Sequence, residues 1–418
     1  MGHMVGKDLC RKLGKKIDGL TMRAPWNETF YEILKALYTS EEADLLIKMP
    51  YGLATIELVE NTTKYERSRL KRILEQMCSK GLVLDVQLKD KIFYIPSPIV
   101  IGLFEFTLMR ADDDLNTGEW ARLFHEYFEQ DNTFFKANFG HSEKISPLRT
   151  LPHEGAVEMT EYVEVLDYEK ATAVAENAKK FAVGICSCRH EKLHIGEKKC
   201  DAPLENCSSF DASADYLIRH NMAKEISRTE MLESLARSKE MGLVFNADNV
   251  QKNVSFICNC CGCCCNILLG ISKYGYSNVV VTSNFIAEGN EDTCLDCGTC
   301  AESCPINAIE MLPDASPKID TSLCIGCGVC ALNCETGALR LVKRKQRVLH
   351  PEDTFEKLIL QCLERGTLQN QLFGNPQSIT HGFMRAVVGG FLRLPPVKKA
   401  LMSDSLRSRF LTALRQMA

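Results

Sequence analysis

CLDCGTCAESCP occupies residues 294–305, and CIGCGVCALNC occupies residues 324–334. Both stretches place their cysteines at the spacing C-x2-C-x2-C-x3-C, and the second begins 30 residues after the first. The Ala-Ile pair at 308–309 is matched by Ala-Leu at 338–339, so the repeat extends beyond the cysteines. Three thiols this close together must share one turning loop, which fixes the local fold around whatever they bind.

Cysteine is the anomaly in the composition. The chain of 418 residues contains 21 cysteines, and 14 of them lie between Cys258 and Cys334. Such density indicates either a disulfide scaffold or metal ligation. The N-terminal 20 residues are basic and lack the apolar run of a secretory signal, and the chain is long enough to bury several cores without disulfides. We therefore expect a reducing, cytoplasmic setting and metal ligation.

The spacing favours 4Fe–4S clusters. In C-x2-C-x2-C-x3-C the first three thiolates surround one cluster, and the fourth cysteine serves the partner cluster. The expected ligand sets are Cys294, Cys297, Cys300 and Cys334 for one cluster, and Cys324, Cys327, Cys330 and Cys304 for the other. A pair of zinc sites is the alternative, but zinc frameworks use two C-x2-C pairs.

This segment, Glu291–Arg340, resembles the bacterial-type two-4Fe–4S ferredoxin domain. Gly298, Gly326 and Gly328 suit that family, because the backbone must approach each cluster closely. One departure is Glu335, where the family usually repeats the proline that follows Cys304. The resemblance implies a ferredoxin domain within a multi-cluster iron–sulfur protein of anaerobic metabolism.

A second group of cysteines follows two apolar strands. CNCCGCCC, residues 258–265, places six thiols in eight residues, and ICSCRH, residues 185–190, adds two more. The ten inner cysteines are Cys186, Cys188, Cys200, Cys207, Cys258, Cys260, Cys261, Cys263, Cys264 and Cys265. Because adjacent cysteines cannot all face one metal with relaxed geometry, the later loop is expected to serve two sites or an unusual cluster. The two strand ends should meet in space and hold one or two further iron–sulfur clusters.

Two features of this inner region suggest chemistry beyond electron relay. The Cys260-Cys261-Gly262 element is similar to part of the CCG motif of heterodisulfide reductase catalytic subunits, which hold non-cubane clusters at a substrate site. Arg189 and His190 are the candidate catalytic residues, since a cation beside cluster thiolates raises the reduction potential and can hold an anion. The alternatives are ordinary relay clusters, with both residues serving as their hydrogen-bond partners.

The N-terminal region has a different character. Helices are predicted at residues 30–38, 42–49, 53–59 and 65–79, and a hairpin at residues 82–88 and 91–95. This pattern resembles a winged helix-turn-helix of MarR-like and ArsR-like regulators. Lys64, Arg67 and Lys71 are expected to share one face of its third helix and could contact DNA phosphates. Protein contact is the alternative use of such a fold.

The sequence thus predicts an α+β multidomain protein. The expected regions are a winged helix at 26–100, a helical linker region at 101–160, a Cys-rich α/β domain at 161–290, the ferredoxin domain at 291–342 and a basic helical tail at 343–418. Residues 341–418 hold 13 Lys/Arg against five Asp/Glu, so a membrane-surface or acidic-partner role competes with a helical layer over the cluster domain. Residues 146–152 are expected to be a linker.

Three functions follow from these patterns. The first is an iron–sulfur electron-transfer protein or oxidoreductase subunit that passes single electrons from the ferredoxin clusters to the inner ones. The second is a reductase whose inner cluster binds a disulfide or similar acceptor, and the third is a redox-sensing DNA-binding regulator. No flavin, nicotinamide or ATP motif is present, so we expect a redox partner protein. The sequence does not give the oligomeric state.

Overall fold

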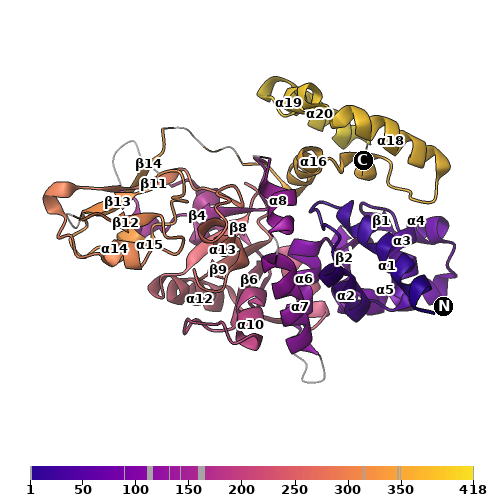
Figure 1. The fold of residues 1–418 in the computed structure, drawn as a ribbon, viewed down its shortest axis with the longest axis horizontal. Coiled ribbons are helices and arrows are strands. Elements are labelled where there is room, and N and C mark those ends of the chain that lie inside the picture. Colours follow the sequence, from indigo (N-terminus) through magenta and orange to yellow (C-terminus); the bar gives the residue numbers. More distant parts are fainter. Residues whose placement is uncertain are drawn as a thin grey trace. The chain divides into compact units, whose positions relative to one another are not determined.

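The computed structural model describes residues 2–88, 90–110, 116–130, 132–141, 143–158, 165–313, 316–345, 348 and 350–417. The chain forms two compact units (Figure 1). The first contains the chain up to Ile145 together with the chain from Thr354 onward, and the second is Ser146–Asp353. Both helices and sheets are present, as predicted for an α+β protein.

The first unit begins with five helices and a small sheet. The helices are α1 (Gly2–Asp18), α2 (Glu28–Leu37), α3 (Ser40–Lys48), α4 (Ile56–Thr63) and α5 (Arg67–Ser79). The strands β1 (Ala54–Thr55), β2 (Val83–Leu88) and β3 (Lys91–Pro96) form an antiparallel sheet in the order β1-β3-β2. The Asn27 side chain caps α2, and Thr39 forms a capping box with Glu42 at the start of α3.

Two details here differ from the sequence prediction. The segment predicted as a helix from residue 53 starts as β1, because Thr55 caps α4 and delays the helix to Ile56. Lys64 ends α4 in the left-handed conformation with φ of 61°, and Glu66 caps α5. Lys64 is therefore not on α5, and its expected alignment with Arg67 on one helix face is wrong. The winged-helix assignment itself stays a prediction.

The rest of this unit is helical. It contains the kinked segment η1 (Ile99–Leu103), in which Val100, Ile101 and Gly102 have non-helical backbone angles, and the helices α6 (Phe104–Met109), α7 (Thr117–Glu129), α8 (Thr133–Phe139), α16 (Thr354–Arg365), α17 (Leu368–Leu372), α18 (Ile379–Leu392), α19 (Pro395–Leu401) and α20 (Asp404–Met417). The aromatic face predicted for α7 packs through Phe124 and Phe128 against Phe104 of α6. Buried leucines from α16, α17, α18 and α20 form a separate hydrophobic cluster. The tail thus belongs to the N-terminal unit, and its expected packing over the cluster domain stays a prediction.

The second unit is built on a seven-stranded sheet in the order β10-β4-β8-β9-β6-β5-β7. Its strands are β4 (Leu148–Leu151), β5 (Phe181–Ile185), β6 (Glu205–Phe210), β7 (Ala223–Glu225), β8 (Val244–Asp248), β9 (Phe256–Cys260) and β10 (Val280–Val281). The predicted linker at 146–152 is wrong, because β4 pairs with β8 and β10 inside the sheet. The four residues of β4 are all buried. Pro147 and Pro152, which suggested a linker, lie directly before and after the strand.

Short helices pack on this sheet and on its loops. They are η2 (Glu154–Ala156), η3 (Asp167–Glu169), α9 (Ala171–Asn177), α10 (Ser187–His194), α11 (Asp211–Arg219), α12 (Arg228–Glu240) and α13 (Asn266–Ser272). Side chains of α9 and α12, including Val174, Met231 and Leu235, join Phe245 and Ile257 of the sheet in one hydrophobic core. Ser227 and Glu230 have the sequence spacing of a capping box and form one, which fixes the start of α12.

The cysteine repeat follows the sheet in the chain. It contains η4 (Glu291–Thr293), the helices α14 (Thr299–Glu302) and α15 (Val329–Leu332), and two antiparallel pairs, β11 (Phe285–Gly289) with β14 (Leu339–Lys343) and β12 (Ile309–Met311) with β13 (Pro317–Ile319). Gly326 has φ of 68°, and a Cβ there would lie 2.1 Å from the Phe285 carbonyl oxygen. Glycine is thus required where this loop crosses β11. Among the helices of the described residues, none has the length and apolar composition needed to cross a bilayer.

Candidate metal centre

The two cysteine-rich strand ends meet at one edge of the central sheet. Both β5 and β9 pair antiparallel with β6, which lies between them, so β5 and β9 run in the same direction. Each strand leads into a cysteine loop and then a short helix, and Cys186 and Cys265 occupy the N-cap positions of α10 and α13. The predicted meeting of the two loops is confirmed by this topology.

Four of the inner cysteines form a compact cluster, which we call the four-thiol group: Cys200, Cys261, Cys263 and Cys264. Their sulfur atoms all lie within 4.8 Å of one another. The Sγ atom of Cys200 is 3.5 Å from that of Cys261 and 4.0 Å from that of Cys264. Cys200 arrives from the loop between α10 and β6, and the other three come from the loop after β9. Four thiols from two loops suit a tetrahedral zinc or iron–sulfur ligand set.

The other six form a second cluster, the six-thiol group: Cys186, Cys188, Cys207, Cys258, Cys260 and Cys265. Cys207 of β6 is the register partner of Cys258 of β9, and their thiols are hydrogen-bonded. The thiol of Cys260 interacts with those of Cys258 and Cys265, and Cys265 in turn interacts with Cys188. The adjacent residues Cys260 and Cys261 thus contribute to different groups. One loop serves two groups of thiols, as the crowding of its cysteines indicated.

Arg189 lies between the two groups. Its side chain is only 1% exposed, and its guanidinium donates to the carbonyl oxygens of Asn259 and Pro203. Burial opposes the charge, but the thiols of Cys186, Cys261 and Cys260 raise the pKa of Arg189 above its ordinary value. The hydrogen bond with Cys264 and the charge of Arg189 in turn lower the pKa of Cys261 to about 4, against the effect of burial. Arg189 also opposes the effect of burial on Cys186, although burial dominates there and raises the pKa of Cys186 to about 12.

The second candidate catalytic residue has a different environment. The Nε2 atom of His190 lies 3.0 Å from Nε2 of His194, one turn further along α10. Burial and the neighbouring His190 lower the pKa of His194. The structure thus supports Arg189 as a neighbour of the thiols, whereas the His190 ring contacts another histidine.

Sequence reasoning missed the buried charges that support these loops. Glu191 and Lys192 are at most 1% exposed, and their side chains form an ion pair of 3.2 Å. The amide of Asn266, at the start of α13, donates to Glu191 at 2.6 Å, and its backbone N–H donates to the Cys188 sulfur. These contacts tie α10 to α13 next to the six-thiol group. The available signal was the run of charged residues that directly follows Cys188.

The second cysteine run and Cys304 line one enclosed cavity. Its walls carry the thiols of Cys304, Cys324, Cys327 and Cys330 and otherwise mostly apolar side chains, among them Ile306, Ile325 and Leu341. Burial raises the pKa of Cys330, and the nearby thiols of Cys327, Cys324 and Cys304 add to the effect. Four thiols around a dry cavity fit the ligand set of a 4Fe–4S cluster. Cys304 thus lies with the second run, where the exchange of ligands requires it.

The first run is more open to solvent. Cys297 is exposed, and the side chain of the neighbouring Leu295 is 71% exposed. The hydroxyl and the backbone N–H of Thr299 lower the pKa of Cys297, and the nearby thiol of Cys334, from the second run, has a smaller opposing effect. Burial raises the pKa of Cys300, with smaller contributions from Cys294 and Cys297. Cys334 thus accompanies the first run in the same way as Cys304 accompanies the second.

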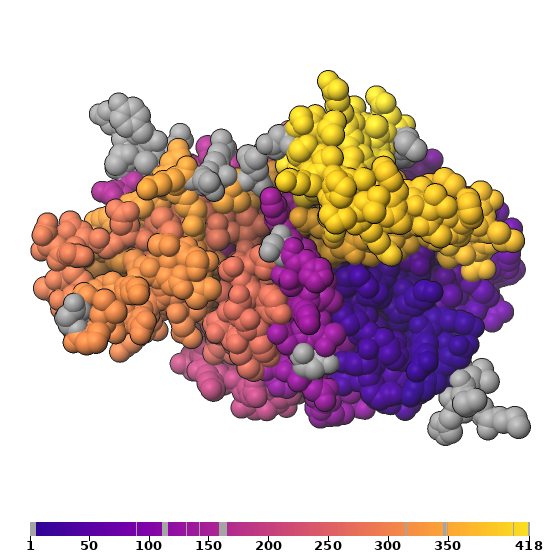
Figure 2. Space-filling model, turned by 45° about the horizontal axis from the view of Figure 1, so that its top comes forward, coloured from indigo at the N-terminus to yellow at the C-terminus, as the bar shows by residue number. Residues whose placement is uncertain are grey.

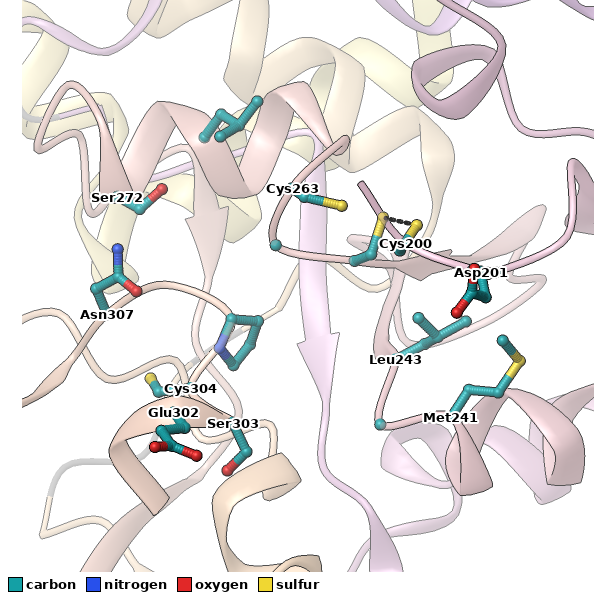
Figure 3. A pocket seen from close by; sticks show the side chains of 16 residues that line it. Cys200, Asp201, Met241, Leu243, Cys263, Ser272, Glu302, Ser303, Cys304 and Asn307 are labelled. Carbon is teal, nitrogen blue, oxygen red and sulfur yellow. Dashed lines mark hydrogen bonds between the residues drawn. The ribbon is translucent and has the colours of Figure 1, made fainter. Parts of the chain in front are cut away.

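The inner loop directly touches the ferredoxin-like segment. A Cβ atom on Gly262 would lie 2.5 Å from the carbonyl oxygen of Pro305, so the two backbones are in close contact. Beside this contact is a cavity of about 630 Å³. Figure 3 shows Cys200 and Cys263 on one side of it and Cys304, Glu302 and Ser303 on the other. One open space therefore borders both the four-thiol group and a cysteine of the repeat.

Two of the four basic side chains of α5, those of Arg67 and Arg69, are paired with carboxylates. Arg67 forms ion pairs with Glu57 at 2.6 Å and Glu60 at 2.8 Å, and Arg69 pairs with Glu41 at 2.5 Å. These acidic neighbours reduce the positive potential that phosphate binding requires. The observations therefore favour DNA binding less than the sequence did.

Comparison with known proteins identifies one segment. Residues 293–338 match the family model of the 4Fe–4S dicluster domain. No curated protein and no solved structure matches the chain. The chain therefore carries an iron–sulfur domain at its cysteine repeat. None of its 21 cysteines, all of which lie within the described residues, forms a disulfide bond.

Proposed function

We propose that the protein is an iron–sulfur electron-transfer protein or oxidoreductase subunit. In this proposal the cysteine repeat holds two 4Fe–4S clusters with the exchanged ligand sets given above, and the inner thiols hold one or two further clusters. Such clusters, when bound, exchange single electrons. The rest of the proposal concerns how the chain's own residues order these sites.

Solvent exposure gives the order. The thiols of the first run lie at the surface, beside the exposed Leu295, where a redox partner protein can dock. The second run is buried, with Cys324, Cys327 and Cys330 each at most 9% exposed. Cys260, Cys261, Cys264 and Cys265 of the inner groups are buried as well. In this proposal the electrons pass along a series, from the exposed first run to the buried second run and then to the inner groups.

The contact between Gly262 and Pro305 is the observation that carries the proposal. Pro305 directly follows Cys304, and Gly262 directly follows Cys261 of the four-thiol group. Two backbone segments in van der Waals contact therefore link the second cluster site to the inner thiols. A larger residue at position 262 would separate them, which explains why glycine stands within this cysteine loop.

Arg189 extends the series to the six-thiol group. Its guanidinium interacts with Cys261 of the four-thiol group and with Cys186 and Cys260 of the six-thiol group. A buried cation stabilises the more negative, reduced state of any site beside it. Arg189 would therefore favour reduction of a cluster held by the inner thiols and is best described as a positioning and electrostatic residue.

The test is iron and acid-labile sulfide per chain in anaerobically purified protein, together with EPR of the reduced sample. About twelve to sixteen irons, the content of three or four cubane clusters, is the expected result. About eight irons, the content of two such clusters, would restrict the redox centres to the repeat and refute the inner part of the proposal.

A cysteine variant tests the ligand exchange. Cys304→Ser should lose or perturb the EPR signal of the cluster at Cys324, Cys327 and Cys330. This is expected although residue 304 is nearer in sequence to the three preceding cysteines of the first run, Cys294, Cys297 and Cys300. Cys10→Ser, in α1 of the other unit, is the matched control and should keep the full iron content. Loss of the other cluster in Cys304→Ser would contradict the exchanged wiring.

The cavity beside Cys200 favours a second candidate, a reductase of a disulfide or similar acceptor. Its lining combines thiols of the four-thiol group with polar side chains such as Ser272 and Asn307, and it is open to solvent. A substrate there should perturb the EPR signal of the reduced inner site. An inner signal unchanged by any disulfide would leave electron relay as the function.

A further inference from the structure

One face of α18 is apolar and open to solvent. Ile379, Phe383, Val387 and Phe391 recur every four residues along the helix, and Leu394 continues the row just beyond it. Their side chains are between 48% and 91% exposed. The smaller residues between them on this side, Ala386 and Gly390, are exposed too, so no charge interrupts the row. At 100° per residue these positions cover a broad, continuous stripe.

The opposite face of α18 is the packed one. Leu392 is buried in the hydrophobic cluster of the tail helices, and a Cβ on Gly389 would lie 2.9 Å from Gln369 of α17. Arg385 donates to the carbonyl oxygens of Phe373 and Asn375. The helix is therefore held in place by its inner face, and the apolar stripe contributes nothing to that packing. Figure 2 shows these tail helices, in yellow, at the molecular surface.

The segment of the chain that carries the stripe is strongly positive. From residue 366 to the C-terminus the chain has seven Lys/Arg and one Asp/Glu, which is a net charge of +6. Arg393, Lys399 and Arg409 are exposed. Arg393 directly precedes Leu394, and Lys399 follows in α19. An exposed apolar stripe of this size normally marks a binding surface in a protein.

The positive charge of this segment distinguishes between two binding partners for the stripe, a second copy of the chain and an anionic lipid surface. A second copy of the chain would bring another +6 segment against the first, which is unfavourable. An anionic lipid surface satisfies both features, because its acyl region accepts the aromatic and aliphatic side chains and its headgroups attract lysine and arginine. The helix is too short to cross a bilayer, so it would lie in the plane of the interface.

We propose that α18 and the basic residues after it form a docking site for an anionic membrane surface. Phe383 and Phe391 are the apolar anchors, and Lys399 and Arg409 provide the electrostatic attraction. The site would place an iron–sulfur protein at a membrane surface. The inference does not depend on the electron-transfer function proposed above.

The full-length protein with its clusters is tested by co-sedimentation with vesicles. Phosphatidylcholine vesicles should bind little, whereas vesicles containing equal parts of phosphatidylcholine and phosphatidylglycerol should pellet the protein, with binding that weakens as salt is added. The double variant Phe383→Ser/Phe391→Ser should bind the anionic vesicles about tenfold or more weakly. Lys399→Glu/Arg409→Glu should weaken binding and its salt dependence while leaving the apolar stripe intact.

The matched control is Ile92→Ser, which removes a comparably exposed apolar side chain from β3 and should bind like the unaltered protein. Equal iron content and equal far-UV circular dichroism show that each variant is folded. Failure of the anionic vesicles to pellet the protein would overturn the proposal. So would a dimer in sedimentation velocity that dissociates in the Phe383→Ser/Phe391→Ser variant, because that result assigns the stripe to a second copy.

Discussion

Glu105 illustrates how a single residue couples the fold to pH. Its carboxylate accepts the backbone N–H of Gly102 at 2.9 Å, at a sharp corner where Ile101 has a positive φ of 55°. Burial nevertheless dominates and raises the pKa of Glu105 from 4.5 to about 7. An acid whose pKa rises on folding stabilises the fold fully below its unfolded pKa, and that stability is lost as the pH rises through 7.

We predict that Glu105→Gln relieves this loss. The amide oxygen can still accept the Gly102 N–H, but it cannot ionise. When the pH is raised from about 5 to about 8.5, the free energy of unfolding of the variant should increase by up to about 3 kcal/mol relative to that of the unaltered protein. Urea unfolding at both pH values, followed by the circular dichroism of the helices, measures the difference. Glu75→Gln, on the exposed side of α5, is the control, and an equal response in both variants would contradict the assignment.

At the scale of an element, the start of α12 depends on a reciprocal cap. The Ser227 hydroxyl accepts the Glu230 N–H at 3.2 Å, and the Glu230 carboxylate accepts the Ser227 N–H at 2.7 Å. The C-terminal end of this helix leads to Met241 and Gly242, which line the cavity beside the four-thiol group. The cap therefore stabilises one wall of the candidate substrate site.

We predict that Ser227→Ala destabilises the first turn of α12 by about 1 kcal/mol, because the Glu230 N–H loses the hydroxyl oxygen to which it donates and the Glu230 carboxylate loses the hydroxyl that donates to it. Hydrogen exchange of the amides in this turn should accelerate about fivefold, the equivalent of that free energy. Ser227→Thr keeps a capping hydroxyl and serves as the control. Unchanged exchange in Ser227→Ala would show that tertiary packing alone fixes the helix start.

Elements also show what the sequence can predict. The Ser227 capping box and the strand Phe181–Ile185 were predictable because their signals are local. β4 was not, since its pairing with β8 joins residues about 100 positions apart and its buried Arg149 resembles a surface residue. That arginine is accommodated because its guanidinium donates to the Tyr168 carbonyl oxygen at 2.6 Å.

The candidate metal centre likewise has features that local sequence patterns predict and features that they do not predict. The spacing of its cysteines predicted that two strand ends meet and that the crowded loop serves two groups. The assignment of Cys200 to the four-thiol group, the position of Arg189 between the groups and the contact of Gly262 with Pro305 all depend on tertiary packing. Local sequence patterns therefore identified the candidate ligands, but they did not show which cysteines belong to which group.

For the whole molecule, the division into two units separates metal from the rest of the fold. All 18 cysteines proposed as ligands lie in Ser146–Asp353, and the other unit holds only Cys10, Cys78 and Cys362. Each unit has a hydrophobic cluster of its own. Because metal binding stabilises only the part of a protein that provides the ligands, the two units should respond differently to its removal.

We predict that an iron chelator under reducing conditions lowers the hydrogen-exchange protection of residues 294–334 and of the loops at 186–207 and 258–265. Amides of α2, α5 and α16, in the other unit, should keep their protection, since no proposed ligand lies there. Mass-spectrometric exchange with and without the chelator measures both responses in one sample. Equal loss in both units would contradict the prediction, and it would mean that the tail helices, including the apolar stripe of α18, depend on the metal content of the other unit.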